Sequence, residues 1–184
     1  MNAYIFDYIS MILLVVVLIA CSITDLRSQR IPNVLTYPTI VVALLYYLSL
    51  NGLDGFISSA LGLMTGTCLL IVPYLMGGMG AGDAKLMGAV GAIVGVKGVI
   101  ISFLLTAMIG GIYALLLIIT KRYHFKGFLS NQLHKFIAFI LTGKISPDDT
   151  VVLHTRPRLC YGLAIALGSI IYITLNLTGY TFPI

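Results

Sequence analysis

Long apolar runs constrain the fold of this chain more than any other feature of its sequence. Five runs, at roughly 7–24, 34–50, 56–76, 98–119 and 159–177, approach the length of about 20 residues that a helix needs to cross a hydrocarbon core of about 30 Å. A sixth run, at 84–96, covers only about 20 Å at about 1.5 Å per residue, so we expect it to be tilted, flanked by re-entrant backbone or extended. Of the 184 residues, 59% are hydrophobic and 9% are charged, which excludes an ordinary soluble domain. The sequence predicts an all-α polytopic membrane protein with six transmembrane helices in one domain, 1–184.

The basic residues predict how these helices are oriented. If the connections 25–33, 77–85 and 120–158 lie on one side, that side holds ten of the eleven Lys and Arg residues, and only Lys97 lies opposite. Basic residues concentrate on the cytoplasmic side of membrane proteins. We therefore expect these connections in the cytoplasm, and both termini and the turns 51–55 and 96–98 on the non-cytoplasmic side.

Two further features concern packing and the long connection. Small residues recur at helical spacing and predict close helix contacts, among them Gly62 with Gly66, and Gly88 with Gly91. Between 120 and 158, apolar residues recur at spacings of three and four and predict an amphipathic helix at the cytoplasmic interface: Phe125, Phe128, Leu129, Leu133, Phe136, Ile137 and Ile140. Interfacial anchoring is the simplest role for this helix, and docking a partner or guiding a substrate is the alternative.

Several kinds of partner and site lack support in the sequence. The basic residues lie between apolar runs, where anionic membrane lipids explain them better than nucleic acid does. No Cys-x-x-Cys pair, metal-binding His spacing or cofactor motif is present, so we expect no metal, cofactor or disulfide framework. The residues concerned are Cys21, Cys68, Cys160, His124, His134 and His154.

Two acidic residues stand where apolar runs meet polar connections. All six acidic residues are Asp; Asp25 ends the first run, and Asp83 opens the short run. A carboxylate at the centre of a membrane helix costs on the order of 2.5–3.5 kcal/mol, so acids in such places are candidates for function. Since both lie on the predicted cytoplasmic side, we expect them to converge. Asp148 and Asp149 follow Pro147 in a polar segment, and a solvated turn or helix cap explains them more simply.

Two converging carboxylates can activate water. Because both cannot ionise cheaply at close range, they share a proton, and one acts as general base while the other acts as general acid. The structural alternative is that both acids cap helices. This suits Asp83 at a helix start, whereas Asp25 lies at a helix C-terminus, where the helix dipole disfavours a negative charge.

The residues beside Asp83 are candidates for substrate binding or support. Gly80 and Gly82 are expected to adopt backbone conformations closed to other residues and to leave room for an extended substrate strand along 77–82. Lys85 is expected to hold charge at the membrane interface or to tune the Asp83 carboxylate.

These motifs resemble those of a known family. The run from Gly80 to Lys85 resembles the Gly-x-Gly-Asp motif of intramembrane aspartic proteases, and Asp25 with the following Ile31-Pro32-Asn33 resembles the type IV prepilin peptidase family specifically. The resemblance covers essentially the whole chain. It implies a bacterial or archaeal cytoplasmic-membrane endopeptidase that removes the basic leader of prepilins or pseudopilins at the cytoplasmic face. It also implies that Asp25 and Asp83 are catalytic, and that Pro32 and Asn33 support the site.

The chain departs from parts of the family pattern. The bifunctional members carry a methyltransferase region with paired Cys-x-x-Cys elements, which this sequence lacks, so it is more similar to the short peptidase-only members of tight-adherence (Flp) pilus systems. Many relatives open the last helix with Pro-Tyr-Gly, where this chain has Cys160-Tyr161-Gly162.

Two other functions fit parts of the sequence. A transporter or channel subunit also uses intramembrane acids, but its pathway normally crosses the membrane, whereas both acids here lie at helix ends on one side. A non-catalytic scaffold of a pilus assembly machine would tolerate substitution of both. The sequence determines neither the particular prepilin nor the oligomeric state.

Overall fold

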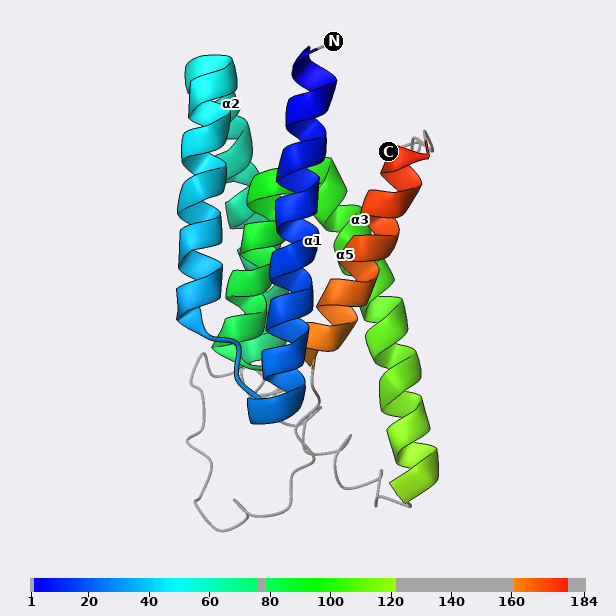
Figure 1. The fold of residues 1–184 in the computed structure, drawn as a ribbon. Helices are drawn as coiled ribbons and strands as arrows, with labels where there is room; N and C mark the ends of the chain where they lie inside the picture. The colour runs from blue at the N-terminus through cyan, green and yellow to red at the C-terminus, as the bar shows by residue number, and fades with distance from the viewer. Residues whose placement is uncertain (1, 76–78, 122–160, 179–184) are drawn as a thin grey trace.

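The computed structural model describes residues 2–75, 79–121 and 161–178, and every regular element in these ranges is an α-helix (Figure 1). The helices are α1 (Asn2–Ser28), α2 (Asn33–Leu75), α3 (Ala81–Lys121) and α5 (Tyr161–Leu177). The prediction of an all-α protein is confirmed for this part of the chain. The predicted interfacial helix between 120 and 158 falls almost wholly outside the described residues, as do Asp148, Asp149 and the three histidines.

Two glycines break the long helices α2 and α3 into segments. Gly52 in α2 has φ 61° and ψ −143°, and Gly95 in α3 has φ 74° and ψ −178°. Positive φ favours glycine, because a Cβ atom would clash with the backbone there. A straight helix of the 43 residues in α2 would be about 65 Å long, about twice the hydrocarbon thickness. The breaks let α2 and α3 each reverse direction instead, as Figure 1 shows.

The breaks refine the predicted turns and the short run. Gly52 falls inside the turn predicted at 51–55, whereas Gly95 lies one residue before the turn predicted at 96–98. The short apolar run predicted at 84–96 belongs to the first segment of α3, which begins earlier, at Ala81. The extension expected for this run is therefore at its N-terminal end.

The second segment of α2 and the first segment of α3 approach backbone to backbone. A Cβ atom on Gly62 would collide with the Gly91 carbonyl oxygen, and a Cβ atom on Gly91 would collide with that of Gly62. The Ser59 hydroxyl donates to the Ala92 carbonyl oxygen at 2.7 Å, close to the same crossing. The close helix contact predicted from Gly62 and its neighbours is confirmed.

Helix α5 joins the remaining elements. It packs on the second segment of α3, where Gly168 lies against Thr106, and α1 contacts α5 more extensively than it contacts α2 or α3. The buried core combines apolar side chains from all four helices, including Leu14, Leu18, Leu70, Met87 and Ile165. Many large apolar side chains lie exposed on the outside, as expected of a protein whose solvent is lipid.

Three stretches within these helices are long and apolar enough to cross a membrane: Ile9–Ser28, Asn33–Leu75 and Ala81–Leu116. The apolar helix Tyr161–Leu177 is shorter. These lengths support a membrane protein, while the six crossings and their orientation stay predictions. In Figure 1, α1 begins and α5 ends at one end of the bundle, and α1 ends while α2, α3 and α5 begin at the other. The second of these ends is called the site end below.

The crossing of Gly62 and Gly91 predicts a specific stability loss. Gly91→Ala should reduce the free energy of unfolding by about 1–3 kcal/mol, because the added methyl group meets backbone that cannot move aside alone. Gly111→Ala is the matched control, since a Cβ atom there would meet nothing within 4 Å beyond its own stretch of helix. Thermal unfolding in detergent measures both variants, and an equal Tm for the two would contradict the close crossing.

Candidate active site

Asp25 lies in the last turn of α1 and is bound by the start of another helix. Its side chain is only 6% exposed, and its Oδ2 atom accepts a hydrogen bond from the Gly162 N–H at 3.0 Å. Gly162 is in the first turn of α5, where backbone N–H groups have no partner within the helix and favour an anion. The positive end of α5 therefore offsets the unfavourable position of Asp25 at the negative end of α1.

Gly162 was not among the site residues predicted from the sequence. A Cβ atom there would lie 2.8 Å from Asp25 Oδ2, so any side chain would push the carboxylate away. The sequence signal was present in the tripeptide Cys160-Tyr161-Gly162, but only the packing of α5 against α1 shows its partner.

Asp83 is the third residue of α3 and is also bound at a helix start. It is 7% exposed, and its Oδ2 atom accepts a hydrogen bond from the Gly80 N–H at 2.9 Å, while its own N–H donates to the Gly80 carbonyl oxygen at 3.1 Å. A side chain at the third helical position commonly accepts a hydrogen bond from the backbone N–H of the N-cap residue in this way. Asp83 therefore does cap the start of α3, but from the third helical position rather than as the N-cap residue that was predicted. This capping leaves a carboxylate with further lone pairs for chemistry.

The structure brings the two acids together at the site end. Asp25 and Asp83 interact electrostatically. Ile31, in the connection between α1 and α2, lies between the helix starts that hold them. A Cβ atom on Gly82 would be 2.9 Å from Ile31 Cβ, and one on Gly162 would be 3.1 Å from Ile31 Cδ1. Ile31 therefore packs against the residue beside Asp83 and against the residue that binds Asp25.

The unusual backbone conformation predicted for Gly80 and Gly82 is wrong, whereas the room predicted there for a substrate strand stays a prediction. Among the described glycines only Gly52 and Gly95 have positive φ, so the backbone at Gly80 and Gly82 is open to any residue. Gly80 instead supplies the N–H that binds Asp83, and Gly82 leaves space for Ile31. The physical cause is close approach of neighbouring groups rather than unusual backbone torsion. Of the segment 77–82, along which the substrate strand is predicted to lie, residues 77 and 78 are outside the described part.

Lys85 contacts the start of α2. Its Nζ atom donates to Asn33 Oδ1 at 3.0 Å and lies 4.8 Å from the centre of the Tyr37 ring. Pro32, just before α2, accepts the Leu35 N–H at 3.1 Å through its carbonyl oxygen. The roles predicted for Lys85, holding charge at the membrane interface or tuning Asp83, stay predictions beside these contacts. The contacts make Lys85 a link between the starts of α2 and α3.

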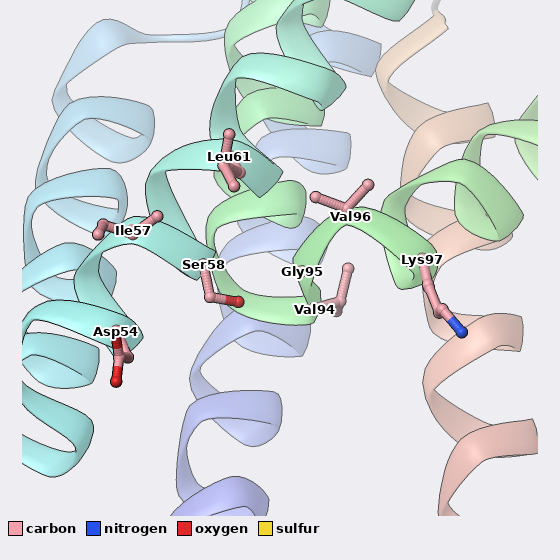
Figure 2. Close-up of a pocket in the computed structure, with 8 residues that line it drawn as sticks. All are labelled: Asp54, Ile57, Ser58, Leu61, Val94, Gly95, Val96 and Lys97. Atoms are coloured by element: carbon pink, nitrogen blue, oxygen red, sulfur yellow. The ribbon is translucent and has the colours of Figure 1, made fainter.

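A surface hollow lies at the opposite end of the bundle. Figure 2 shows it around the break at Gly95, with Asp54 and Ser58 on α2 and Lys97 on α3. Asp83 and Gly95 are separated by twelve residues of α3, or about 18 Å along a helix axis. The hollow is therefore separate from the two buried acids.

The arrangement at the site end is suited to one kind of chemistry. Burial disfavours the charged form of a carboxylate, and a second carboxylate nearby disfavours it further, so these surroundings favour a shared proton over two full charges. Such a pair can accept a proton from water and donate one to a leaving group in the same reaction. Both carboxylates are oriented by backbone N–H groups, which hold them without an intervening flexible side chain.

Comparison with known proteins relates this chain to one family. The type IV leader peptidase family matches residues 12–115. The prepilin leader peptidase/N-methyltransferase of Aeromonas salmonicida (strain A449) is 34% identical over 123 residues, which are 61% of this chain and 41% of that protein. The protein of the same name from Bacillus subtilis (strain 168) is 31% identical over 110 residues, 57% of this chain and 43% of its own length. That of Neisseria gonorrhoeae is 30% identical over 121 residues, 62% of this chain and 42% of its own length.

The chain thus spans about two fifths of the length of these relatives. No solved structure matches it. The family match covers more than half of the 184 residues and includes Asp25, Asp83 and the glycines beside Asp83. This chain therefore belongs to the type IV leader peptidase family.

Proposed function

We propose that this protein is a membrane aspartic endopeptidase that removes the basic leader of prepilins or pilin-like proteins, with Asp25 and Asp83 as its catalytic pair. The observation that carries the proposal is the meeting of two buried acids from α1 and α3, each held by a backbone N–H at a helix start. Family membership supports the same activity, since the relatives are prepilin leader peptidases by name.

The proposed reaction is hydrolysis of a peptide bond by an activated water. The ionised carboxylate of the pair takes a proton from water, and the water oxygen adds to the scissile carbonyl carbon. The proton held by the other carboxylate then passes to the leaving amine as the carbon–nitrogen bond breaks. After the reaction, the carboxylate that was ionised is protonated and the other is ionised. Transfer of a proton within the pair restores the initial state.

The proposed location follows from charge and from the substrate class. The basic connections predict that the site end faces the cytoplasm of a bacterium or archaeon, with both termini on the other side. A prepilin carries an apolar helix, so it reaches the pair laterally from lipid. Its scissile peptide must unwind, because a helical backbone keeps the carbonyl group hydrogen-bonded. The basic leader is attracted by the acids and by anionic headgroups, since the protein's own basic residues repel it.

A transporter or channel is less well supported by the site. Among residues 9–75, 79–116 and 161–178, Asp25 and Asp83 are the only buried residues with a charged type of side chain, and both lie at the same end. A non-catalytic scaffold would not depend on either acid. Substitution of the acids separates all three functions.

Asp25→Asn and Asp83→Asn should each lower the cleavage rate by about 1,000-fold or more, because an amide cannot take up or hold the shared proton. Co-expression with a candidate prepilin measures this as loss of a leader-sized shift, with mass spectrometry of the new N-terminus. Asp54→Asn is the control, since Asp54 is exposed near Gly52, away from the site end. Full processing by either site variant would contradict the proposed pair.

Gly162→Ala should lower kcat by about 100-fold, because its methyl group displaces the Asp25 carboxylate from its position. Purified protein and a peptide that contains the leader junction provide the measurement. Gly111→Ala should cleave normally. Equal rates for the two alanine variants would show that Gly162 does not set the position of Asp25.

Lys85→Met and Asn33→Ala should each lower kcat/KM by roughly 10-fold, because each removes the same charged hydrogen bond between α2 and α3. The double variant should lose little more than either single variant, since the two residues share one interaction. The peptide assay measures all four proteins of this cycle. If the fold-loss of kcat/KM in the double variant equalled the product of the two single fold-losses, the residues would act independently.

A further inference from the structure

The first turn of α5 reaches both acids through neighbouring residues. The Gly162 N–H binds Asp25, and the side chain of Tyr161, the residue before it, interacts electrostatically with Asp83. The Tyr161 side chain is half-buried. One short stretch of backbone therefore places a hydrogen-bond donor beside one acid and a phenol within electrostatic range of the other.

The Tyr161 ring is held in place by a glycine of α3. A Cβ atom built on Gly110 would lie 2.7 Å from Tyr161 Cε2 and 3.1 Å from both Cζ and the hydroxyl oxygen. The ring therefore lies directly on the backbone of the second segment of α3. Because this contact restricts the ring, its hydroxyl group is already ordered and can act without the entropy cost of ordering a mobile side chain.

Packing on a glycine does not by itself explain why Tyr161 lies within electrostatic range of Asp83. Tyr172 on the same helix makes the same kind of contact, with its hydroxyl oxygen 2.7 Å from a Cβ atom built on Gly98. That hydroxyl group accepts a hydrogen bond from Asn176 Nδ2 at 3.2 Å. Tyr172 lies eleven residues beyond Tyr161, or about 16 Å along the helix. The two tyrosines share their packing and differ in their distance from the acids.

Peptide hydrolysis creates a need that the acids alone meet poorly. When water adds to the carbonyl carbon and the ionised carboxylate takes its proton, the negative charge of the pair passes to the carbonyl oxygen, while the proton of the other carboxyl group is used later by the leaving amine. A neutral donor directed at this oxygen stabilises the transition state, and one such donor typically contributes about 100- to 1,000-fold in rate. A phenol is protonated at neutral pH and can donate without adding a further negative charge.

We propose that Tyr161 is a third catalytic residue, whose hydroxyl group donates a hydrogen bond to the carbonyl oxygen of the scissile peptide as that oxygen becomes negative. This inference rests on the proposed peptidase function. Tyr161 keeps its proton throughout: the proton from water goes to one carboxylate, and the proton for the leaving amine comes from the other.

The test is Tyr161→Phe, which keeps the ring on Gly110 and removes only the hydroxyl group. In the purified peptide assay, kcat should fall about 100-fold while KM stays within about two-fold, and Tm should stay at the wild-type value. Tyr172→Phe is the matched control and should cleave at the wild-type rate. The pH–rate profile of Tyr161→Phe should have its maximum at the same pH as the wild-type profile, with a lower maximal rate.

Two results would overturn this inference alone. One is wild-type cleavage by Tyr161→Phe. The other is a pH–rate profile of Tyr161→Phe that is shifted to a different pH but reaches the wild-type maximal rate. A residue that only tunes the pKa of Asp83 would give this result. Failure of the wild-type protein itself to cleave, with no difference from Asp25→Asn, would instead overturn the proposed function and this inference with it.

Discussion

The structure depends on how two buried carboxylates are stabilised away from water. Carboxylates in this setting lose hydration, and lipid offers nothing in exchange. The compensation comes from backbone N–H groups at helix starts: Gly80 for Asp83 and Gly162 for Asp25. These groups are already without helical partners, so binding a carboxylate satisfies both sides at once. For both acids, the start of a helix supplies a backbone donor.

The helix arrangement serves this compensation. The breaks at Gly52 and Gly95 return the chain to the site end, so that the starts of α3 and α5 meet the end of α1. Without reversal, a helix as long as α3 would carry its two ends far apart. The backbone contact between Gly62 and Gly91 then sets how closely the segments of α2 and α3 lie. Small residues far from the acids thus set the geometry close to them.

Ile31 links the apolar packing of the protein to the geometry of the site. It lies in a polar connection, yet its side chain packs between Gly82 and Gly162 and so separates the two helix starts that bind the acids. An apolar spacer at this point excludes water from the backbone hydrogen bonds around it, which strengthens them. On the far side of Asp83, the Lys85 bond to Asn33 holds the same connection near the start of α3.

The sequence by itself determined the helical class, the membrane setting and the family, and it predicted the two acids, because apolar length, charge placement and local motifs are properties of the chain read in order. It placed Gly80 and Gly82 at the site but assigned them the wrong physical role, since torsion and close approach cannot be told apart without neighbours. Only the tertiary structure decided that Gly162 binds Asp25, that Ile31 separates the helix starts and that Tyr161 lies within electrostatic range of Asp83. The bond between Gly162 and Asp25 joins positions 137 residues apart. Its existence depends on how α1 and α5 pack in three dimensions, which no local pattern records.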